Sequence, residues 1–183
     1  LLKKRYLAWV YELGEKSIQG KRLVEHLQLR PGLIAKCCKY FPAGNRGLSP
    51  YTRIHDFTHI NIQDSLQTEN QETMVGILVE GQAGLDNLKD IVKVEGIDLI
   101  YLGLFDICQS VGLPGQLNHP KVLGEIKRCC ELIQSNGIAA GSMSTSVEYI
   151  NMLKDVGYTF IAYLNDAAAM KFHFDDIVKQ LNQ

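Results

Sequence analysis

The chain has 183 residues, which is enough for one domain with a full hydrophobic core. Its 19 basic and 20 acidic residues leave a formal net charge of −1, which argues against nucleic-acid or membrane-surface binding through bulk charge. No apolar run approaches the length of a membrane-spanning helix, and no signal-type apolar core follows the first residues, so we expect a cytoplasmic protein.

Five cysteines occur, an odd number, and four of them form two adjacent pairs. Neighbouring side chains on a helix point in different directions, and no Cys-x-x-Cys spacing is present. The pattern predicts buried or half-buried thiols in a reducing compartment rather than a zinc site.

The N-terminal third mixes helical patterns with loops. Apolar residues at helical spacing predict a helix over 3–14, and a short apolar piece at 22–24 is a weak strand candidate. A helix is predicted over 31–39, where Pro31 suits the first turn. A turn-rich loop covers 41–50, and an irregular or partly helical excursion covers 51–66.

The centre of the chain reads as a strand–helix–strand unit. The apolar run 75–79 ends on Glu80, a helical segment covers about 85–94, and a second apolar run, 99–105, ends on Asp106. Strands that are apolar on both faces are typical of buried parallel sheets, where ligands bind at the carboxyl edge. Two carboxylates at neighbouring strand ends are what a divalent metal ion needs.

The remaining residues continue the alternation. After a loop over 109–118, the predicted elements are a helix from Asn118 or His119 to Ser135, a strand at 137–141, a helix capped by Ser144 or Thr145 and stopped near Gly157, a strand at 158–164, and a closing helix over about 167–182. Five strands alternate with helices from residue 21 onward, which predicts a parallel sheet with right-handed crossovers.

At this point the ordered motifs carry a resemblance. They are Tyr40-Phe41-Pro42 with Gly44-Asn45-Arg46-Gly47, Leu78-Val79-Glu80, Glu95-Gly96-Ile97-Asp98, Gly103-Leu104-Phe105-Asp106-Ile107, Val111-Gly112-Leu113-Pro114-Gly115, Asn118-His119-Pro120-Lys121-Val122, and Asp155-Val156-Gly157-Tyr158-Thr159-Phe160-Ile161-Ala162. In this order they resemble the HpcH/HpaI family of metal-dependent, pyruvate-using class II aldolases, from about residue 6 to the end.

The resemblance implies an α/β fold of the (β/α)8 TIM-barrel type, with the first three strands lacking in this chain. Residues 1–183 would form a single domain, the C-terminal part of the barrel. The family swaps its last helix between subunits, which implies a homo-oligomer of dimer to hexamer size with a swapped C-terminal helix. No nucleic-acid or membrane partner is expected.

The implied reaction is reversible aldol cleavage of a 4-hydroxy-2-oxo acid to pyruvate and an aldehyde. By resemblance, Glu80 and Asp106 hold Mg²⁺ or Mn²⁺, and the backbone N–H groups at Phe105 and Asp106 bind the pyruvate carboxylate. Hard oxygen ligands suit these two ions. His26, near a predicted strand end, is a candidate substrate contact, although a packed or solvated histidine is the favoured interpretation.

Three departures from the family pattern are visible. Leu78 stands where the family usually has Gln, and Leu104 stands where it usually has Pro. The catalytic base, a His with a partner Asp, and the Arg that polarises the keto oxygen have no counterpart. Two explanations stay open: the chain is a fragment of a longer protein, or it is a short protein whose open sheet edges a partner chain covers.

Two other functions therefore remain. One is a non-catalytic, barrel-derived subunit that keeps the metal site, and the other is a citrate-lyase-type or malyl-CoA-type lyase of the same superfamily. A separate metal pair at His55 and His59, four residues apart, is less favoured than a solvated or interface role, because no third ligand is evident. Arg46 is expected to fix its loop by a hydrogen bond rather than bind an anion.

Overall fold

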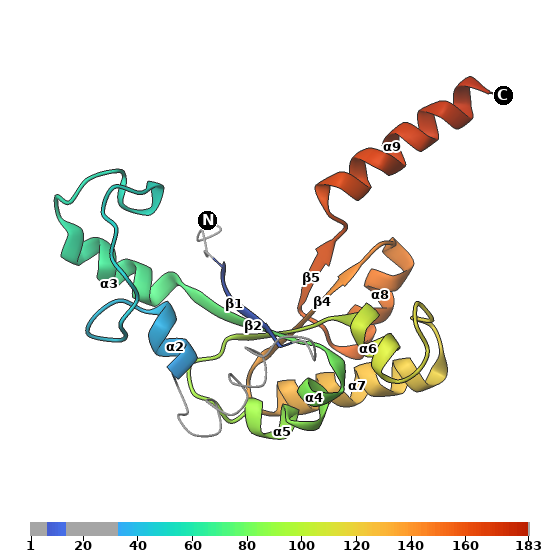
Figure 1. The fold of residues 1–183 in the computed structure, drawn as a ribbon, viewed down its shortest axis with the longest axis horizontal. Helices are drawn as coiled ribbons and strands as arrows, with labels where there is room; N and C mark the ends of the chain where they lie inside the picture. Colours follow the sequence, from blue (N-terminus) through green and yellow to red (C-terminus); the bar gives the residue numbers. More distant parts are fainter. Residues whose placement is uncertain (1–6, 14–32, 183) are drawn as a thin grey trace.

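The computed structural model describes residues 7–13 and 33–182, and these contain a five-stranded sheet (Figure 1). The strands are β1 (Leu7–Leu13), β2 (Met74–Val79), β3 (Leu99–Leu102), β4 (Ala139–Ser144) and β5 (Phe160–Tyr163). All four neighbouring pairs are parallel, and the strands lie side by side in chain order. Chain-order winding is that of a barrel, since a doubly wound sheet reverses its strand order.

The helices of the described residues are α2 (Leu33–Cys38), the 3₁₀ turn η1 (Arg53–His55), α3 (Ile62–Glu72), α4 (Gly81–Asp86), α5 (Leu88–Ile91), α6 (Leu104–Ser110), α7 (Pro120–Ser135), α8 (Val147–Val156) and α9 (Asp166–Leu181). The predicted helix over 118/119–135 is confirmed as α7: Pro120 occupies its first turn and the His119 side chain accepts a 3.2 Å bond from the Lys121 N–H. None of these helices is long and apolar enough to cross a membrane.

One face of the sheet is covered by helices. The side chains of Val75, Ile77 and Val79 on β2 are almost fully buried against the core cluster, which also includes residues of α4 to α8. Figure 1 shows α4, α5 and α7 together on one side of the sheet. Right-handed crossovers between parallel strands place successive helices on the same face when the strand order does not reverse.

The opposite face carries a row of side chains across four strands. The register pairs Leu78 with Tyr101, Tyr101 with Gly141, and Gly141 with Phe160. The rings of Tyr101 and Phe160 meet edge to face, with their centres 6.2 Å apart. A Cβ atom at Gly141 would lie 2.8 Å from Leu99 Cδ1 and 3.2 Å from Phe160 Cδ1, so a side chain there would be crowded. In a closed barrel this face is the interior, filled by such layers. Leu78, Tyr101 and Phe160 are half-buried here.

The helix predicted over residues 3–14 is wrong: Leu7–Leu13 is β1, paired parallel with β2. Its apolar residues also fit helical spacing, but Val10, Trp9 and Tyr11 favour strands, and the pairing with β2 decides the outcome. The weak strand predicted at 22–24 lies outside the described residues.

Boundaries differ at three further places. The predicted 85–94 helix is two short helices, α4 and α5, separated at Asn87. Residues 103–105, predicted as strand, belong to the turn and first residues of α6, because β3 ends at Leu102. Strand β4 extends to Ser144, so Ser146 caps α8 in place of the predicted Ser144 or Thr145.

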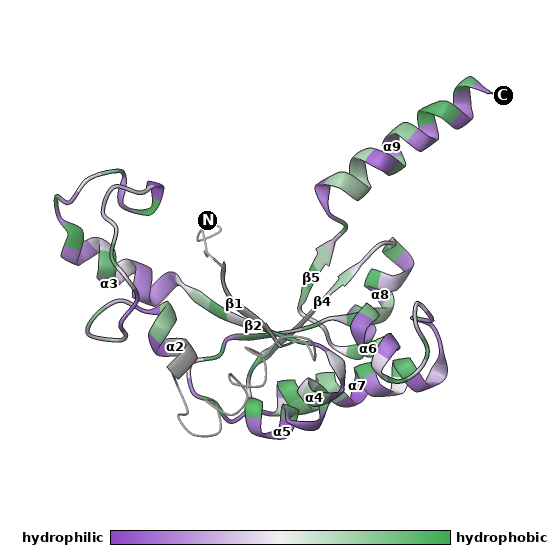
Figure 2. Ribbon diagram, in the orientation of Figure 1, coloured by the Kyte–Doolittle hydropathy of each residue, from purple (hydrophilic) through white to green (hydrophobic). Residues whose placement is uncertain are grey.

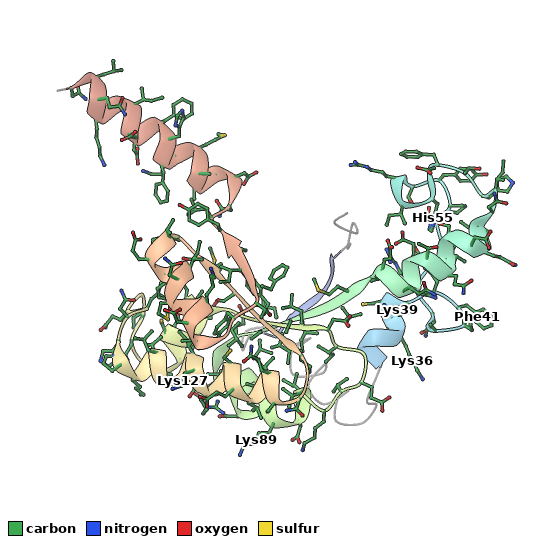
Figure 3. The ribbon with its side chains drawn as sticks, turned by 180° about the vertical axis from the view of Figure 1, so that it is seen from behind. Lys36, Lys39, Phe41, His55, Lys89 and Lys127 are labelled. Atoms are coloured by element: carbon green, nitrogen blue, oxygen red, sulfur yellow. The ribbon has the colours of Figure 1, made fainter. Side chains whose placement is uncertain are left out.

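A polar network joins α2 to α3. The Lys39 Nζ donates to the backbone carbonyls of Asn70 (2.7 Å) and Thr73 (2.6 Å), and the Asn70 side chain exchanges two bonds with the backbone of Tyr40. The Arg46 guanidinium lies 4.7 Å from the centre of the Tyr40 ring. Arg46 therefore fixes its loop, as expected, but by a cation–π contact. Figure 3 shows Lys39 and His55 in this region.

Helix α9 extends away from the sheet (Figure 1). None of its residues is buried, and its ribbon carries hydrophobic segments along its length (Figure 2). Met170, Phe174, Ile177, Val178 and Leu181 recur at helical spacing and form one apolar stripe, which we call the α9 stripe.

Candidate metal and substrate site

Glu80 lies at the carboxyl end of β2, where its backbone is still extended (φ −148°, ψ 158°). Alternation along the strand places it on the same face as Leu78, away from the helices that cover Val79. Although Glu80 precedes α4, its side chain makes no capping bond to that helix. Glu80 as a whole residue is only 7% exposed. A buried carboxylate that does not cap the adjacent helix is a candidate ligand rather than a helix-start residue.

The neighbouring strand ends beside Glu80. Val79 pairs with Leu102, and the Gly103 N–H donates to the Val79 carbonyl at 3.0 Å. A Cβ atom at Gly103 would lie 2.8 Å from Glu80 Oε2 and 2.9 Å from Glu80 Cβ. The Glu80 side chain therefore rests directly on the backbone of Gly103. Sequence reasoning missed this contact, whose signal is a glycine one residue past the end of β3.

Asp106 and Phe105 lie in the first turn of α6, which begins immediately after Gly103. Both side chains are exposed. The first N–H groups of a helix have no acceptor within the helix, so those of Phe105 and Asp106 are oriented as donors at this rim. Glu80 and Asp106 thus come from adjacent βα units at the carboxyl edge of the sheet, as the sequence predicted.

Two carboxylates and the surrounding edge fit a hard divalent ion. Carboxylate oxygens are the ligands that Mg²⁺ and Mn²⁺ prefer, and Mg²⁺ commonly takes only one or two carboxylates, keeping water or substrate oxygens at its other positions. In residues 7–13 and 33–182, no group of three or more His, Cys, Asp or Glu side chains is arranged to hold a metal.

The same edge carries polar residues that the sequence did not single out for the site. Ser144 ends β4, and its hydroxyl donates to the Ser146 carbonyl at 2.7 Å. Asn165 follows β5 and caps α9 by accepting a 2.7 Å bond from the Ala168 N–H. Both side chains are used in local turns, so they shape the edge and provide no further carboxylate.

The histidines divide into separate roles. His26 lies outside the described residues. His55 is buried, with Nδ1 2.7 Å from the Ser65 hydroxyl and Nε2 3.3 Å from the Tyr40 hydroxyl. His59 is exposed beside the Tyr51 hydroxyl. Because η1 ends at His55, the two residues do not share a helix face, and the solvated role expected for His55 is wrong.

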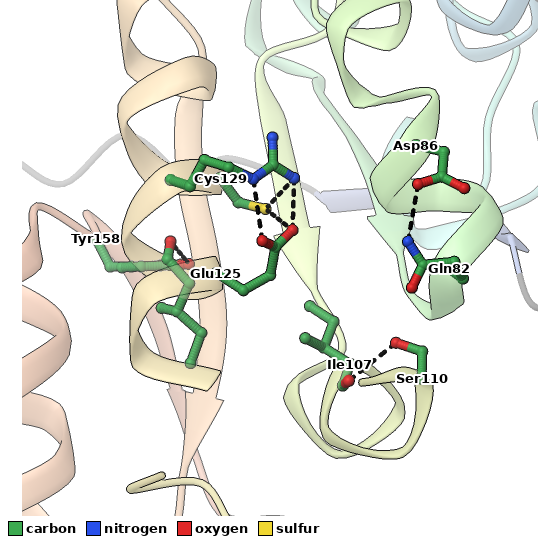
Figure 4. A network of polar contacts seen from close by, with 9 residues as sticks. Gln82, Asp86, Ile107, Ser110, Glu125, Cys129 and Tyr158 are labelled. Carbon is green, nitrogen blue, oxygen red and sulfur yellow. Dashed lines mark hydrogen bonds and ion pairs between the residues drawn. The ribbon is translucent and has the colours of Figure 1, made fainter. Parts of the chain in front are cut away.

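The buried cysteines are unsuited to nucleophilic chemistry. Four of the five are buried, and burial raises the pKa of the Cys38, Cys108, Cys129 and Cys130 thiols. The pKa of Cys129 is raised to about 12 by burial and by the adjacent Glu125 carboxylate. Figure 4 shows Cys129 beside Glu125, which accepts two bonds from Arg128, of 2.5 and 3.0 Å. Low thiolate content makes these residues part of the packing.

Comparison with known proteins identifies relatives of this chain. Residues 32–170 match the family model described as HpcH/HpaI aldolase/citrate lyase. A hydroxypyruvate/pyruvate aldolase of Roseobacter denitrificans is 31% identical over 138 residues, covering 75% of this chain and 53% of that protein. A 4-hydroxy-2-oxo-heptane-1,7-dioate aldolase of Escherichia coli is 29% identical over 128 residues, covering 69% of this chain and 48% of that protein.

A solved structure shares the fold. The HpcH/HpaI aldolase from Desulfitobacterium hafniense superposes with a TM-score of 0.72 at 23% identity, covering 81% of this chain and 57% of that one. This likeness confirms the predicted TIM-barrel type, of which the five described strands form a part. The chain spans about half the length of the curated relatives it matches. The family match over residues 32–170 shows that the chain belongs to the HpcH/HpaI aldolase/citrate lyase family.

Proposed function

We propose that this protein is a metal-dependent (class II) aldolase, a carbon–carbon lyase that reversibly cleaves a 4-hydroxy-2-oxo acid to pyruvate and an aldehyde. The observation that carries the proposal is the position of the buried Glu80 side chain, which rests on the backbone of Gly103. Gly103 lies three residues before Asp106 in the chain. The aldolases among the relatives support the reaction class. We assign residues 1–183 to a single domain, the C-terminal part of the barrel.

The residues of the site have distinct roles in this proposal. Glu80 and Asp106 hold Mg²⁺ or Mn²⁺ through their carboxylate oxygens. The bound ion supplies Lewis-acid stabilisation for negative charge on a keto oxygen. The N–H groups of Phe105 and Asp106 donate to the carboxylate of the oxo acid, and His26 contacts the substrate. The general base and the keto-polarising arginine are assigned to no residue of this chain.

A cleavage assay tests the proposal. Pyruvate release from 4-hydroxy-2-oxoheptanedioate is measured on the full-length protein with Mn²⁺, with Mg²⁺ and after EDTA treatment, for the wild type, Glu80→Gln and Asp106→Asn. We expect activity that depends on the ion and falls at least about 10-fold in each variant, the size of loss typical for a weakened metal site. Asp155→Asn, an exposed carboxylate on α8, is the matched control. Unchanged activity in Glu80→Gln contradicts the assignment.

A second candidate is a non-catalytic member that retains the metal site. Leu78, half-buried on the same face of β2 as Glu80, favours it, because an apolar side chain replaces the amide usual in the family. This candidate predicts that the protein binds Mn²⁺ and pyruvate without cleaving any 4-hydroxy-2-oxo acid. Cleavage by the wild-type protein eliminates it, and cleavage gained only in Leu78→Gln supports it.

The partner in this proposal is another copy of the chain. Helix α9 buries none of its residues, and a 16-residue helix is marginal in water without a surface that covers its apolar stripe. We propose that α9 packs on a neighbouring subunit, as a swapped C-terminal helix, in a homo-oligomer of dimer to hexamer size. The near-zero net charge and the free thiols support a cytoplasmic protein that binds small oxo acids rather than nucleic acid.

A further inference from the structure

Gly103 occupies a position whose backbone does not require glycine. Its dihedral angles, φ −79° and ψ 87°, lie on the negative-φ side that other residues adopt. Many glycines occur in turns because they adopt a left-handed backbone conformation. That does not explain the glycine at position 103, whose φ is negative. The reason has to be found in the space around its Cα atom.

That space is filled by Glu80. A Cβ atom at position 103 would lie 2.8 Å from Glu80 Oε2 and 2.9 Å from Glu80 Cβ, both well inside ordinary van der Waals contact. Rotation of the flexible Glu80 side chain could relieve the first contact. The second contact is with Glu80 Cβ, which is bonded directly to the Glu80 backbone, so rotation of the side chain does not move it.

Gly103 also connects the two proposed ligands. Its N–H donates to the Val79 carbonyl, one residue before Glu80, at 3.0 Å. Its carbonyl accepts from the Ile107 N–H at 2.9 Å and so holds the first turn of α6, which contains Asp106. A shift at Gly103 is therefore transmitted to both carboxylates.

We infer that Gly103 is a positioning residue that seats the Glu80 carboxylate at the metal site by leaving its own side-chain space empty. The inference rests on the proposed function, since it concerns the same site. Replacement by alanine pushes the Glu80 carboxylate away from the strand end and separates the β2 and β3 termini. Residues that orient metal ligands typically change metal affinity by about 10- to 100-fold when mutated.

Two other glycines provide matched controls. A Cβ at Gly84 on α4 would lie 2.9 Å from Val79 Cγ1, so Gly84→Ala overpacks β2 on its helix-covered face without touching Glu80. Gly124 on α7 has no atom within 4 Å of its Cβ position, so Gly124→Ala adds a methyl group in open space. Gly84→Ala tests whether overpacking alone weakens metal binding, and Gly124→Ala tests whether a glycine-to-alanine change alone does so. An effect seen only in Gly103→Ala is then due to displacement of the Glu80 carboxylate.

Mn²⁺ binding, measured by electron paramagnetic resonance of the free ion, is the test. We expect the Mn²⁺ dissociation constant to rise about 10- to 100-fold in Gly103→Ala. It should change less than twofold in Gly84→Ala and Gly124→Ala. Circular dichroism and urea unfolding check that the variants are folded. Wild-type Mn²⁺ affinity in Gly103→Ala overturns the inference.

A double-mutant cycle covers the case in which Gly103→Ala folds poorly. Glu80→Gly vacates the space from the other side, so the destabilisation by Gly103→Ala should be smaller in the Glu80→Gly background than in the wild type. Equal destabilisation in both backgrounds overturns the inference. Absence of Mn²⁺ binding by the wild type overturns the proposed function, while the cycle still decides whether Gly103 seats the Glu80 side chain.

Discussion

The hydroxyl group of Tyr158 donates a 3.1 Å hydrogen bond to the backbone carbonyl of Ile126. Tyr158 lies two residues before the start of β5, whereas Ile126 lies in the middle of α7. The bond therefore ties the segment that leads into the last strand to a long helix that covers the sheet. The side chain is almost fully buried, and burial raises the pKa of Tyr158 above its usual value. Figure 4 shows Tyr158 with the dashed line that marks this bond.

Tyr158→Phe removes this donor while keeping the ring. We expect the free energy of unfolding to fall by about 1 kcal/mol, the net value of a typical intramolecular hydrogen bond. Urea unfolding measures the change. Tyr163→Phe, on an exposed ring of β5, is the control and should change the free energy of unfolding by less than about 0.5 kcal/mol. Equal effects of the two substitutions contradict the structural role of the Tyr158 bond.

The buried Cys129 thiol and Tyr149 hydroxyl predict a loss of stability at high pH. Burial raises the pKa of Tyr149 to about 12 and, with the nearby Glu125 carboxylate, that of Cys129 to about 12, from ordinary values of 10.0 and 9.0. At a pH between the ordinary pKa and the raised pKa of each group, the unfolded chain has released a proton that the folded protein retains. The free energy of unfolding therefore falls as pH rises through this range. The decline should span pH 9 to about 12.

Urea unfolding at intervals from pH 8 to 11 measures this slope. Cys129→Ala removes one of the groups, so its curve should fall less steeply above pH 9 than the wild-type curve. Cys37→Ala, at an exposed thiol, is the control and should retain the wild-type slope. A Cys129→Ala curve parallel to that of the wild type shows that the Cys129 thiol titrates normally in the folded protein.

The sheet from residue 74 onward was predictable because its signals are local. Buried parallel strands are short apolar runs such as that around Ile77, and the helices between them have clear ends at Pro120 and Gly157. Residues 7–13 gave no such signal, because their apolar residues fit the spacing of a helix as well as the alternation of a strand. Only pairing with β2 distinguishes the two, and that pairing joins residues far apart in the chain.

The candidate site was predictable in part for the same reason. Glu80 and Asp106 follow recognisable apolar runs, so their place at the carboxyl edge could be inferred from sequence. The contact of Glu80 with Gly103 depends on the register between β2 and β3, which the sequence does not state. The burial of His55 depends on Tyr40 and Ser65, which meet it only in the folded chain.

His55 and His59 can be distinguished by mutation. His55→Ala removes a buried ring held by the Tyr40 and Ser65 hydroxyls and leaves both hydroxyls without that partner. We expect a loss of about 1–3 kcal/mol in the free energy of unfolding, typical for breaking a buried polar contact. His59→Ala, at an exposed position, should change it by less than about 0.5 kcal/mol.

Mn²⁺ binding gives these variants a second measurement. If the two histidines served as a metal pair, both substitutions would weaken Mn²⁺ binding together. We expect neither to change it, because the proposed ligands lie at the ends of β2 and β3 and His55 is held by two side-chain hydroxyls. A parallel loss of affinity in both variants contradicts the structural role of His55.

Charged substitutions in the α9 stripe should change the oligomeric state. Phe174 and Ile177 lie in its middle, and both side chains are exposed in the single chain. Replacing both with glutamate places two charges on the surface that we propose packs on a neighbouring subunit. Burying an unpaired charge in an apolar contact is strongly unfavourable, so Phe174→Glu/Ile177→Glu should convert the wild-type oligomer to a species of lower molar mass.

Size-exclusion chromatography with light scattering measures the molar mass. Phe172→Glu is the matched control, because Phe172 is exposed on the same helix but lies on the side opposite the stripe at helical spacing. It introduces the same side chain and should leave the molar mass unchanged. If the control and the double variant dissociate the oligomer equally, charge on α9 rather than loss of the stripe is responsible. An unchanged molar mass in the double variant shows that the stripe does not hold the subunits together.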